Sequence, residues 1–364
     1  MTVRHAIRAL TVVATSALTV LAGSAADASA GRAWSPVRPI TSGLDGPYGL
    51  DVRSPGRALV AESDTGEITE VNLRTGAQRT LISGLPGPSA VAAYGGKIYV
   101  ALGGGGPEGG PAPAYPPASV LVANADGTGV RVLADLMAYE LEHNPDGQVQ
   151  FTESGEPYDA LSNPFSMVAT RWGLLIADGG GNDVLRVDPR TGRISTYFVP
   201  PNPRTPACLE PGAQANPGTV GCDSVPTGVT VAGRYVYVST LGAESPGAAA
   251  VFKLDGRTGT VLRAWRGFTA LTGVAAAPNG TVYASEVLYG APAGDGPPPP
   301  GFDPSTVGRI TRIDHGRITY AQVTMPTGLE YFEGRLYASS WSIASFLGIP
   351  HAGQLVQVRP GAFH

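Results

Sequence analysis

The stretch that decides the fold is Leu174-Leu175-Ile176-Ala177-Asp178-Gly179-Gly180-Gly181-Asn182-Asp183-Val184-Leu185-Arg186-Val187-Asp188. It begins with an apolar run, continues through a glycine-rich turn that holds two carboxylates, and ends in a run where apolar and polar residues alternate. Alternation with a period of two is typical of a β-strand that has one buried face. The stretch therefore predicts two β-strands joined by a tight turn.

The same phrase recurs, with drift, five more times along the chain. Each unit opens with a phrase like Pro-Thr-Gly-Val and then offers a second, a third and a fourth strand. The six openings begin at Pro47, Pro88, Pro164, Pro226, Leu271 and Pro326. Six four-stranded units with almost no helical periodicity predict an all-β fold, a six-bladed β-propeller. A degenerate seventh blade within residues 134–162 is the alternative.

The two ends of the repeat array predict how the ring closes. The sixth unit stops at Val358, which leaves no room for its fourth strand. Residues 38–44, which precede the first unit, match residues 79–85, which close that unit. We therefore expect the N-terminal strand to complete the last blade, since that blade would otherwise keep an unpaired edge.

Residues 1–30 have the pattern of a secretory signal peptide. Arg4 and Arg8 precede an apolar run at residues 9–21 that is too short to span a bilayer, and Ala28-Ser29-Ala30 offers a cleavage site. An uncleaved membrane anchor is the alternative interpretation. We expect a secreted, extracellular protein whose single propeller domain covers residues 31–364, without a further segment that is apolar and long enough to cross a membrane.

The net charge of the chain argues against one class of partner, nucleic acid. The full chain has a formal charge of −4, and loss of Arg4, Arg8 and Asp27 with the leader leaves −5. A mildly acidic protein is a poor partner for nucleic acid, which binds clustered Lys and Arg.

The only two cysteines, Cys208 and Cys222, lie in one proline-rich loop. We expect them to form a disulfide in an oxidising compartment, with two free thiols as the alternative.

Long insertions fall in two loop classes that share one face of a propeller. They join strands 2 and 3 of a blade, or one blade to the next, at residues 102–117, 134–162, 199–225, 241–249, 287–307 and 341–353. Long loops confined to one face indicate the functional surface. One of these loops, from Asp135 to Gly147, has the pattern of a short capped helix that ends at Asn-Pro.

Acidic residues end the second strand in alternate blades, at Glu62, Asp178 and Glu286. Three carboxylates near one channel mouth, with Asn163 as a further oxygen donor, would suit Ca²⁺, which takes oxygen ligands. The interpretation that we favour is that each carboxylate accepts hydrogen bonds from N–H groups of the following turn. The residues near the start of the innermost strands form a poor set of metal ligands: Tyr48, Ser89, Phe165, Thr227, Thr272 and Thr327.

Five segments carry a family resemblance: Asp135-Leu136-x-Ala138-Tyr139-Glu140, Asn144-Pro145-Asp146-Gly147, Asn163-Pro164-Phe165, Ala177 to Asp183, and Val225-Pro226-Thr227-Gly228-Val229. Together they resemble the ScyD/ScyE family, exported propeller-like proteins named after a gene cluster for scytonemin, a cyanobacterial sunscreen pigment. The likeness spans nearly all of the chain after the leader. The repeat phrase by itself is shared with NHL and gluconolactonase-type propellers. The resemblance implies export and a propeller fold, and it brings no settled activity.

Two functions are open at this point. The favoured one is a monomeric extracellular binding or scaffold protein that holds a small molecule, a glycan or a protein on its loop-rich face. The other, suggested by similar six-bladed propellers, is a hydrolase or lactonase with Ca²⁺ in the channel. The sequence has no HExxH and no Gly-x-Ser-x-Gly motif, which argues against zinc hydrolysis and Ser-His-Asp catalysis.

Overall fold

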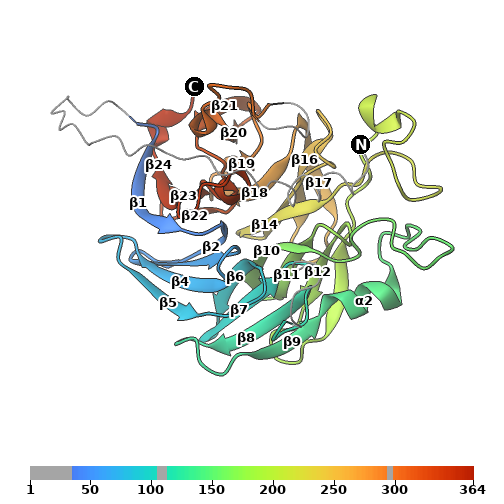
Figure 1. The fold of residues 1–364 in the computed structure, drawn as a ribbon, viewed down its shortest axis with the longest axis horizontal. Coiled ribbons are helices and arrows are strands. Elements are labelled where there is room, and N and C mark those ends of the chain that lie inside the picture. Colours follow the sequence, from blue (N-terminus) through green and yellow to red (C-terminus); the bar gives the residue numbers. More distant parts are fainter. Residues whose placement is uncertain (1–34, 105–112, 293–297) are drawn as a thin grey trace.

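The computed structural model describes residues 35–104, 113–292 and 298–364. Within them, twenty-four strands form six four-stranded antiparallel sheets, arranged as blades around a central axis (Figure 1). The predicted six-bladed β-propeller is confirmed. The predicted leader, residues 1–30, lies outside the described residues.

Each blade places its strands in chain order from the axis outward, except that the last blade takes its outer strand from the N-terminus. Blade one is β2 (Pro47–Ser54), β3 (Arg57–Glu62), β4 (Glu67–Asn72) and β5 (Gln78–Ile82); blade two is β6 (Pro88–Tyr94), β7 (Lys97–Leu102), β8 (Ser119–Asn124) and β9 (Arg131–Asp135); blade three is β10 (Pro164–Thr170), β11 (Gly173–Asp178), β12 (Asp183–Val187) and β13 (Ile194–Phe198). Blade four is β14 (Pro226–Ala232), β15 (Tyr235–Thr240), β16 (Ala249–Asp255) and β17 (Val261–Phe268); blade five is β18 (Leu271–Ala276), β19 (Val282–Glu286), β20 (Arg309–Asp314) and β21 (Arg317–Gln322); blade six is β22 (Leu329–Phe332), β23 (Arg335–Ser340), β24 (Gly353–Val358) and β1 (Val37–Leu44).

The N-terminal strand closes the ring, as predicted. β1 pairs antiparallel with β24, in a register that joins Val37 to Val358 and Leu44 to Gly353. In Figure 1 the blue N-terminal strand lies beside the red C-terminal strands. The first described strand of the chain is therefore the outer strand of its last blade.

In the described residues, helical structure lies in the connections and in the segment after the last strand. The α-helix α2 (Leu136–His143) follows blade two, and its N-cap Asp135 accepts a hydrogen bond from Ala138 N. Short 3₁₀ turns are η1 (Ala207–Leu209), η2 (Pro304–Thr306), η3 (Ala344–Leu347) and η4 (Pro360–Ala362). The capped helix predicted after Asp135 is confirmed. Residues 134–162 form no seventh blade, because after β9 they hold only this helix and one isolated bridge, between Phe151 and Pro157.

The apolar core lies between the blades. Each of six buried clusters takes its residues from two neighbouring blades. Between blades one and two, for example, Leu59 and Ile68 pack with Val100 and Leu121. The cluster between blades six and one includes Leu44 of the closing strand. Closure therefore adds buried apolar surface, which stabilises the fold, as well as strand pairing.

The Pro-Thr-Gly-Val phrase has a structural explanation at the axis. In four blades the hydroxyl of its second residue donates to a carbonyl that starts the next blade: Ser89 to Pro164 at 2.7 Å, Thr227 to Leu271 at 2.6 Å, Thr272 to Pro326 at 2.9 Å, and Thr327 to Pro47 at 3.0 Å. The glycine that follows allows the innermost strands to approach closely. A Cβ atom at Gly273 would lie 2.1 Å from the Thr327 carbonyl oxygen, which no side chain tolerates.

The connection between blades three and four carries the predicted disulfide. Cys208 and Cys222 are bonded, with their Cα atoms 4.9 Å apart. This bond is confirmed and agrees with an oxidising compartment. None of the helices in the described ranges has the length and apolar character needed to cross a membrane.

Candidate functional site

Asp178, at the end of β11, is held by donors from its own blade and from the preceding connection. Its side chain is buried, with 1% exposed. The carboxylate accepts hydrogen bonds from Ser162 Oγ at 2.5 Å, Asn163 N at 2.6 Å, Gly180 N at 3.1 Å and Gly181 N at 3.2 Å. Burial raises the pKa of Asp178, and these hydrogen bonds oppose the rise. Such contacts are those of a carboxylate that caps a turn.

Glu286 and Glu62 occupy the equivalent positions in blades five and one. Glu286 forms a two-pronged ion pair with Arg309, at 2.8 Å from Nε and 3.0 Å from Nη2, and also accepts from the Thr311 hydroxyl. Glu62 accepts from Asp45 N at 2.8 Å. Burial is the main cause that raises the pKa of Glu62. Both carboxylates therefore have protein partners, but these are not N–H groups of the turn that follows the strand, so the predicted turn cap is confirmed for Asp178 and was wrong for Glu62 and Glu286.

Asn163 is the fourth residue that the sequence suggested for a metal. Its side-chain oxygen accepts from Gly104 N at 2.8 Å, and its own N–H donates to Asp178. The structure thus brings Asn163 and Asp178 together, and it shows no contact that joins Glu62 or Glu286 to them among the described residues. In the described part of the chain, no three His, Cys, Asp or Glu side chains are arranged to hold a metal ion. A metal at these four residues stays a prediction.

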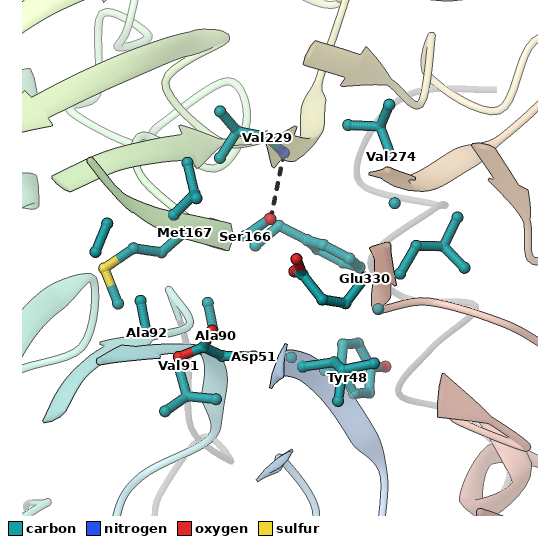
Figure 2. A pocket seen from close by; sticks show the side chains of 18 of the residues that line it. Tyr48, Asp51, Ala90, Val91, Ala92, Ser166, Met167, Val229, Val274 and Glu330 are labelled. Carbon is teal, nitrogen blue, oxygen red and sulfur yellow. Dashed lines mark hydrogen bonds between the residues drawn. The ribbon is translucent and has the colours of Figure 1, made fainter. Parts of the chain in front are cut away.

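A cavity of about 200 Å³ lies in the central channel. The innermost strands β2, β6, β10, β14, β18 and β22 line it. Most of its lining residues are small or apolar. Asp51 and Glu330 are the charged exceptions, and no Lys, Arg or His is among the described residues that line it. The cavity is therefore an acidic site with an otherwise neutral wall (Figure 2).

Asp51 and Glu330 hold the same place in the repeat. Each is the fifth residue of its opening phrase, counted from Pro47 and Pro326, and the two phrases belong to neighbouring blades one and six. The other blades have Ala92, Val168, Thr230 and Ala275 at this place. Sequence reasoning missed the pair, because it compared the ends of the second strands and the starts of the first strands. Comparison of the fifth positions would have found it.

The two carboxylates have different surroundings. Asp51 Oδ2 accepts from Ala93 N at 2.8 Å. The Glu330 carboxylate points into the middle of the cavity in Figure 2, and no described residue donates a hydrogen bond to it. Burial, followed by the nearby charge of Asp51, raises the pKa of Glu330 to about 8. At neutral pH this group is therefore largely protonated, and a bound cation would favour its ionised form.

Two aromatic rings occupy the loop-side end of the cavity. Tyr48 of blade one and Phe165 of blade three replace the hydroxyl residue that the other blades carry at this place. Their ring centroids are 5.6 Å apart and the planes are tilted by 59°. Burial raises the pKa of the Tyr48 hydroxyl above its usual range. Because innermost strands begin on the loop-rich face, this pair lies at the end of the cavity nearest that face.

Comparison with known proteins supports the fold class. No family model and no curated protein matches the chain. Solved structures do match. The calcium-binding protein regucalcin from Agrobacterium tumefaciens has 14% identity and a TM-score of 0.51, over 90% of this chain and 92% of that one. A gluconolactonase from Xanthomonas campestris has 10% identity and a TM-score of 0.53, over 89% of both chains.

A third neighbour, an oxidoreductase (glucose dehydrogenase) from Thermus thermophilus, has 16% identity and a TM-score of 0.53, over 88% of this chain and 98% of that one. These neighbours are NHL/SMP-30-like six-bladed β-propellers. The chain is similar to them in architecture. Identities this low show a shared fold, and the function has to be argued from the site.

Proposed function

We propose that this chain is a secreted binding protein of the ScyD/ScyE type that holds a small cationic molecule in its central channel. The observation that carries the proposal is the Glu330 carboxylate, which points into a cavity whose other charged lining residue is also an acid. Glu330 is half-buried, and a carboxylate withdrawn from bulk solvent is unfavourable unless a cation or hydrogen-bond donors complete it. An ammonium group in the cavity would supply both.

Other lining groups suit the same ligand. Ser166 Oγ accepts from Val229 N at 3.3 Å, and its second lone pair is available to accept a hydrogen bond from an ammonium N–H inside the cavity. Tyr48 and Phe165 add aromatic rings at the loop-side end, and aromatic faces attract cations. Drug-sized ligands occupy pockets of about 300–1,000 Å³, so a cavity of about 200 Å³ favours a smaller molecule such as a simple amine.

The alternative, a Ca²⁺-dependent hydrolase or lactonase, has less support from the predicted ligands. The carboxylates of Glu62, Asp178 and Glu286 already accept hydrogen bonds from protein groups, and the first strands contribute few oxygen donors for a metal. The lactonase and dehydrogenase activities named for the structural neighbours belong to those proteins.

The test is thermal unfolding and calorimetric titration of residues 31–364 with methylamine and ethanolamine. Glycerol serves as a neutral probe and acetate as an anionic one. We expect the amines to raise the melting temperature of the wild type, because a ligand bound only by the folded state stabilises it. Glu330→Gln should abolish the effect. Glu333→Gln, which changes an acid three residues away that does not line the cavity, should leave it intact.

Three further results would decide between the functions. Binding of an amine should strengthen as pH rises toward about 8, because the cation selects the ionised form of Glu330. Equal binding by the wild type and Glu330→Gln would contradict the proposal. Turnover of a sugar lactone that requires added Ca²⁺ would favour the hydrolase.

A further inference from the structure

An acidic corner lies away from the channel, where α2 and the connections around blade three meet the β11–β12 turn. We use the name acidic corner for six carboxylates: Glu140, Asp146, Asp159, Asp178, Asp183 and Asp223. In the described part of the chain none of the six forms an ion pair with Lys, Arg or His. Burial, and after it the charges of other members, raises the pKa of Glu140 to about 8 and that of Asp159 to about 7.

Asp183 is the least satisfied member of the acidic corner. Its side chain is fully buried, with 0% exposed, and neither carboxylate oxygen has a hydrogen-bond partner among the described residues. Asp183 pairs in register with Asp178, whose carboxylate receives four hydrogen bonds. Two buried acids thus lie side by side, one fully satisfied and the other not. A buried, unpartnered carboxylate needs a counter-charge.

Neutral oxygens near the acidic corner are also left without partners. The side-chain oxygens of Asn144, Gln148 and Asn216 are buried and accept no hydrogen bond from the described residues. Their amide nitrogens are in use: Asn144 donates to Gln148 O at 2.9 Å, Gln148 to Asp223 Oδ1 at 2.7 Å, and Asn216 to Val149 O at 3.1 Å. These hydrogen bonds fix the orientation of each amide group and leave its oxygen without a partner among the described residues. Unpaired oxygens beside carboxylates are the donors that a hard cation takes.

Glu140 packs closely against the glycine turn that precedes Asp183. A Cβ atom at Gly181 would lie 3.1 Å from Glu140 Oε2 and 3.5 Å from the Leu161 carbonyl oxygen. Glu140 Oε1 is fixed by Gln150 Nε2 at 2.8 Å, so Oε2 is the oxygen that lies against the turn. Carboxylate and carbonyl oxygens therefore border the turn from which Asp183 extends.

We propose that the acidic corner binds a Ca²⁺ ion, with the Asp183 carboxylate as its central ligand and Glu140 as a second. Neutral oxygens must complete the coordination, because no three of the described carboxylates converge as a ready metal site. Ca²⁺ fits this requirement, since it accepts six to eight oxygens in irregular geometry, whereas Mg²⁺ demands a near-ideal octahedron. The ion would tie α2 to the β11–β12 turn, and so fix the long connection of residues 134–162 on the loop-rich face.

The test compares thermal unfolding of residues 31–364 in EDTA and in rising Ca²⁺, to about 10 mM because extracellular calcium sites bind at about 10⁻⁴–10⁻³ M. At a concentration about 100 times the dissociation constant, we expect a rise of about 4 °C in the melting temperature. The same concentration of Mg²⁺ should give a smaller rise. Calorimetry should find one Ca²⁺ per chain.

Matched variants locate the ion. Asp183→Asn and Glu140→Gln should each abolish the Ca²⁺ response. Glu62→Gln should retain the response, because Glu62 is a buried acid that already accepts a hydrogen bond from a backbone N–H. If Asp183→Asn does not fold, Glu140→Gln and the wild-type stoichiometry still decide the matter. A response lost in Glu62→Gln and kept in Asp183→Asn would overturn the proposal. The proposal would also be overturned if the wild type bound no Ca²⁺ and the Asp183→Asn variant melted at a higher temperature than the wild type. The acids would then be stabilised by shared protons and not by a metal ion.

Discussion

The ion pair between Glu286 and Arg309 gives the sharpest test of how this propeller uses its buried acids. The Glu286 side chain is 3% exposed and that of Arg309 is 17% exposed. The guanidinium also lies between two aromatic rings, at 3.5 Å from the centroid of Tyr289 and 3.8 Å from that of Tyr320. We consider Arg309→Met, which keeps most of the length of the side chain and removes its charge.

The expected loss is large. Without Arg309, the Glu286 carboxylate stays buried with the Thr311 hydroxyl as its remaining described partner. Removal of one partner from a buried pair costs about 3–5 kcal/mol. With an unfolding entropy of about 2.1 cal/mol/K per residue over residues 31–364, this corresponds to a fall of about 4–7 °C in the melting temperature. Glu286→Gln added to Arg309→Met should recover part of the loss, because no buried charge is left unpaired.

Urea unfolding and thermal unfolding measure the effect, with two probes to establish a two-state transition. Arg57→Met is the control, because Arg57 pairs with Glu70 at 3.3 Å on the surface and its side chain is 64% exposed. That change should cost about 0–1 kcal/mol. Equal losses for Arg309→Met and Arg57→Met would refute our reasoning. A gain of Ca²⁺ response in Arg309→Met would instead show that Glu286 is able to bind a metal.

Ring closure, the Asp178 cap and the channel carboxylate each carry a prediction of their own. Deletion of residues 31–44, which removes β1, should expose the edge of β24 and cause aggregation. An unchanged monomer peak in size-exclusion chromatography, together with an unchanged melting temperature, would contradict the closure argument. Asp178→Ala should lower the free energy of unfolding by about 1–3 kcal/mol in urea titrations, because it leaves the buried N–H of Gly181 and the partly buried N–H groups of Asn163 and Gly180 unpaired. A neutral effect would speak against the cap. Glu330, which faces Asp51, has a pKa of about 8 in the folded state, above the ordinary value of 4.5. Between these two pH values the folded state holds a proton that the unfolded state has lost. The wild type should therefore lose stability as pH rises through that window. Glu330→Gln should flatten this slope and be the more stable protein at pH values above about 8, and parallel curves for the two proteins would show that Glu330 is not buried against Asp51.

The fold was predictable because each position of the repeat has a local physical role. The hydroxyl of Thr227 bridges to the next blade, and Gly273 permits close approach at the axis. Both residues are read directly from the phrase. Ring closure was also predictable, because a missing fourth strand after Val358 and a surplus strand before Pro47 can be counted without coordinates.

The candidate sites were harder to predict, because burial arises only when the ring closes. Glu330 looks like any polar residue in an alternating strand until five other blades enclose it. In the acidic corner, Gln148 meets Asp223 across 75 residues, a separation that no short motif records. Even for Asp178, whose glycine turn was noticed, the donor Ser162 comes from the preceding connection and lies outside the phrase.

Burial does not separate the acids whose charge the fold balances from the acids that it leaves without a partner, whereas hydrogen bonding does. Asp178 and Asp183 are both buried and lie in register on adjacent strands. The first receives four hydrogen bonds, so its charge is already balanced by the fold. The second receives none from the described residues, so its charge requires something that the chain does not provide. The same contrast holds between Glu286, which Arg309 neutralises, and Glu330, which faces another acid in the channel. Ligands should therefore be sought at Asp183 and Glu330.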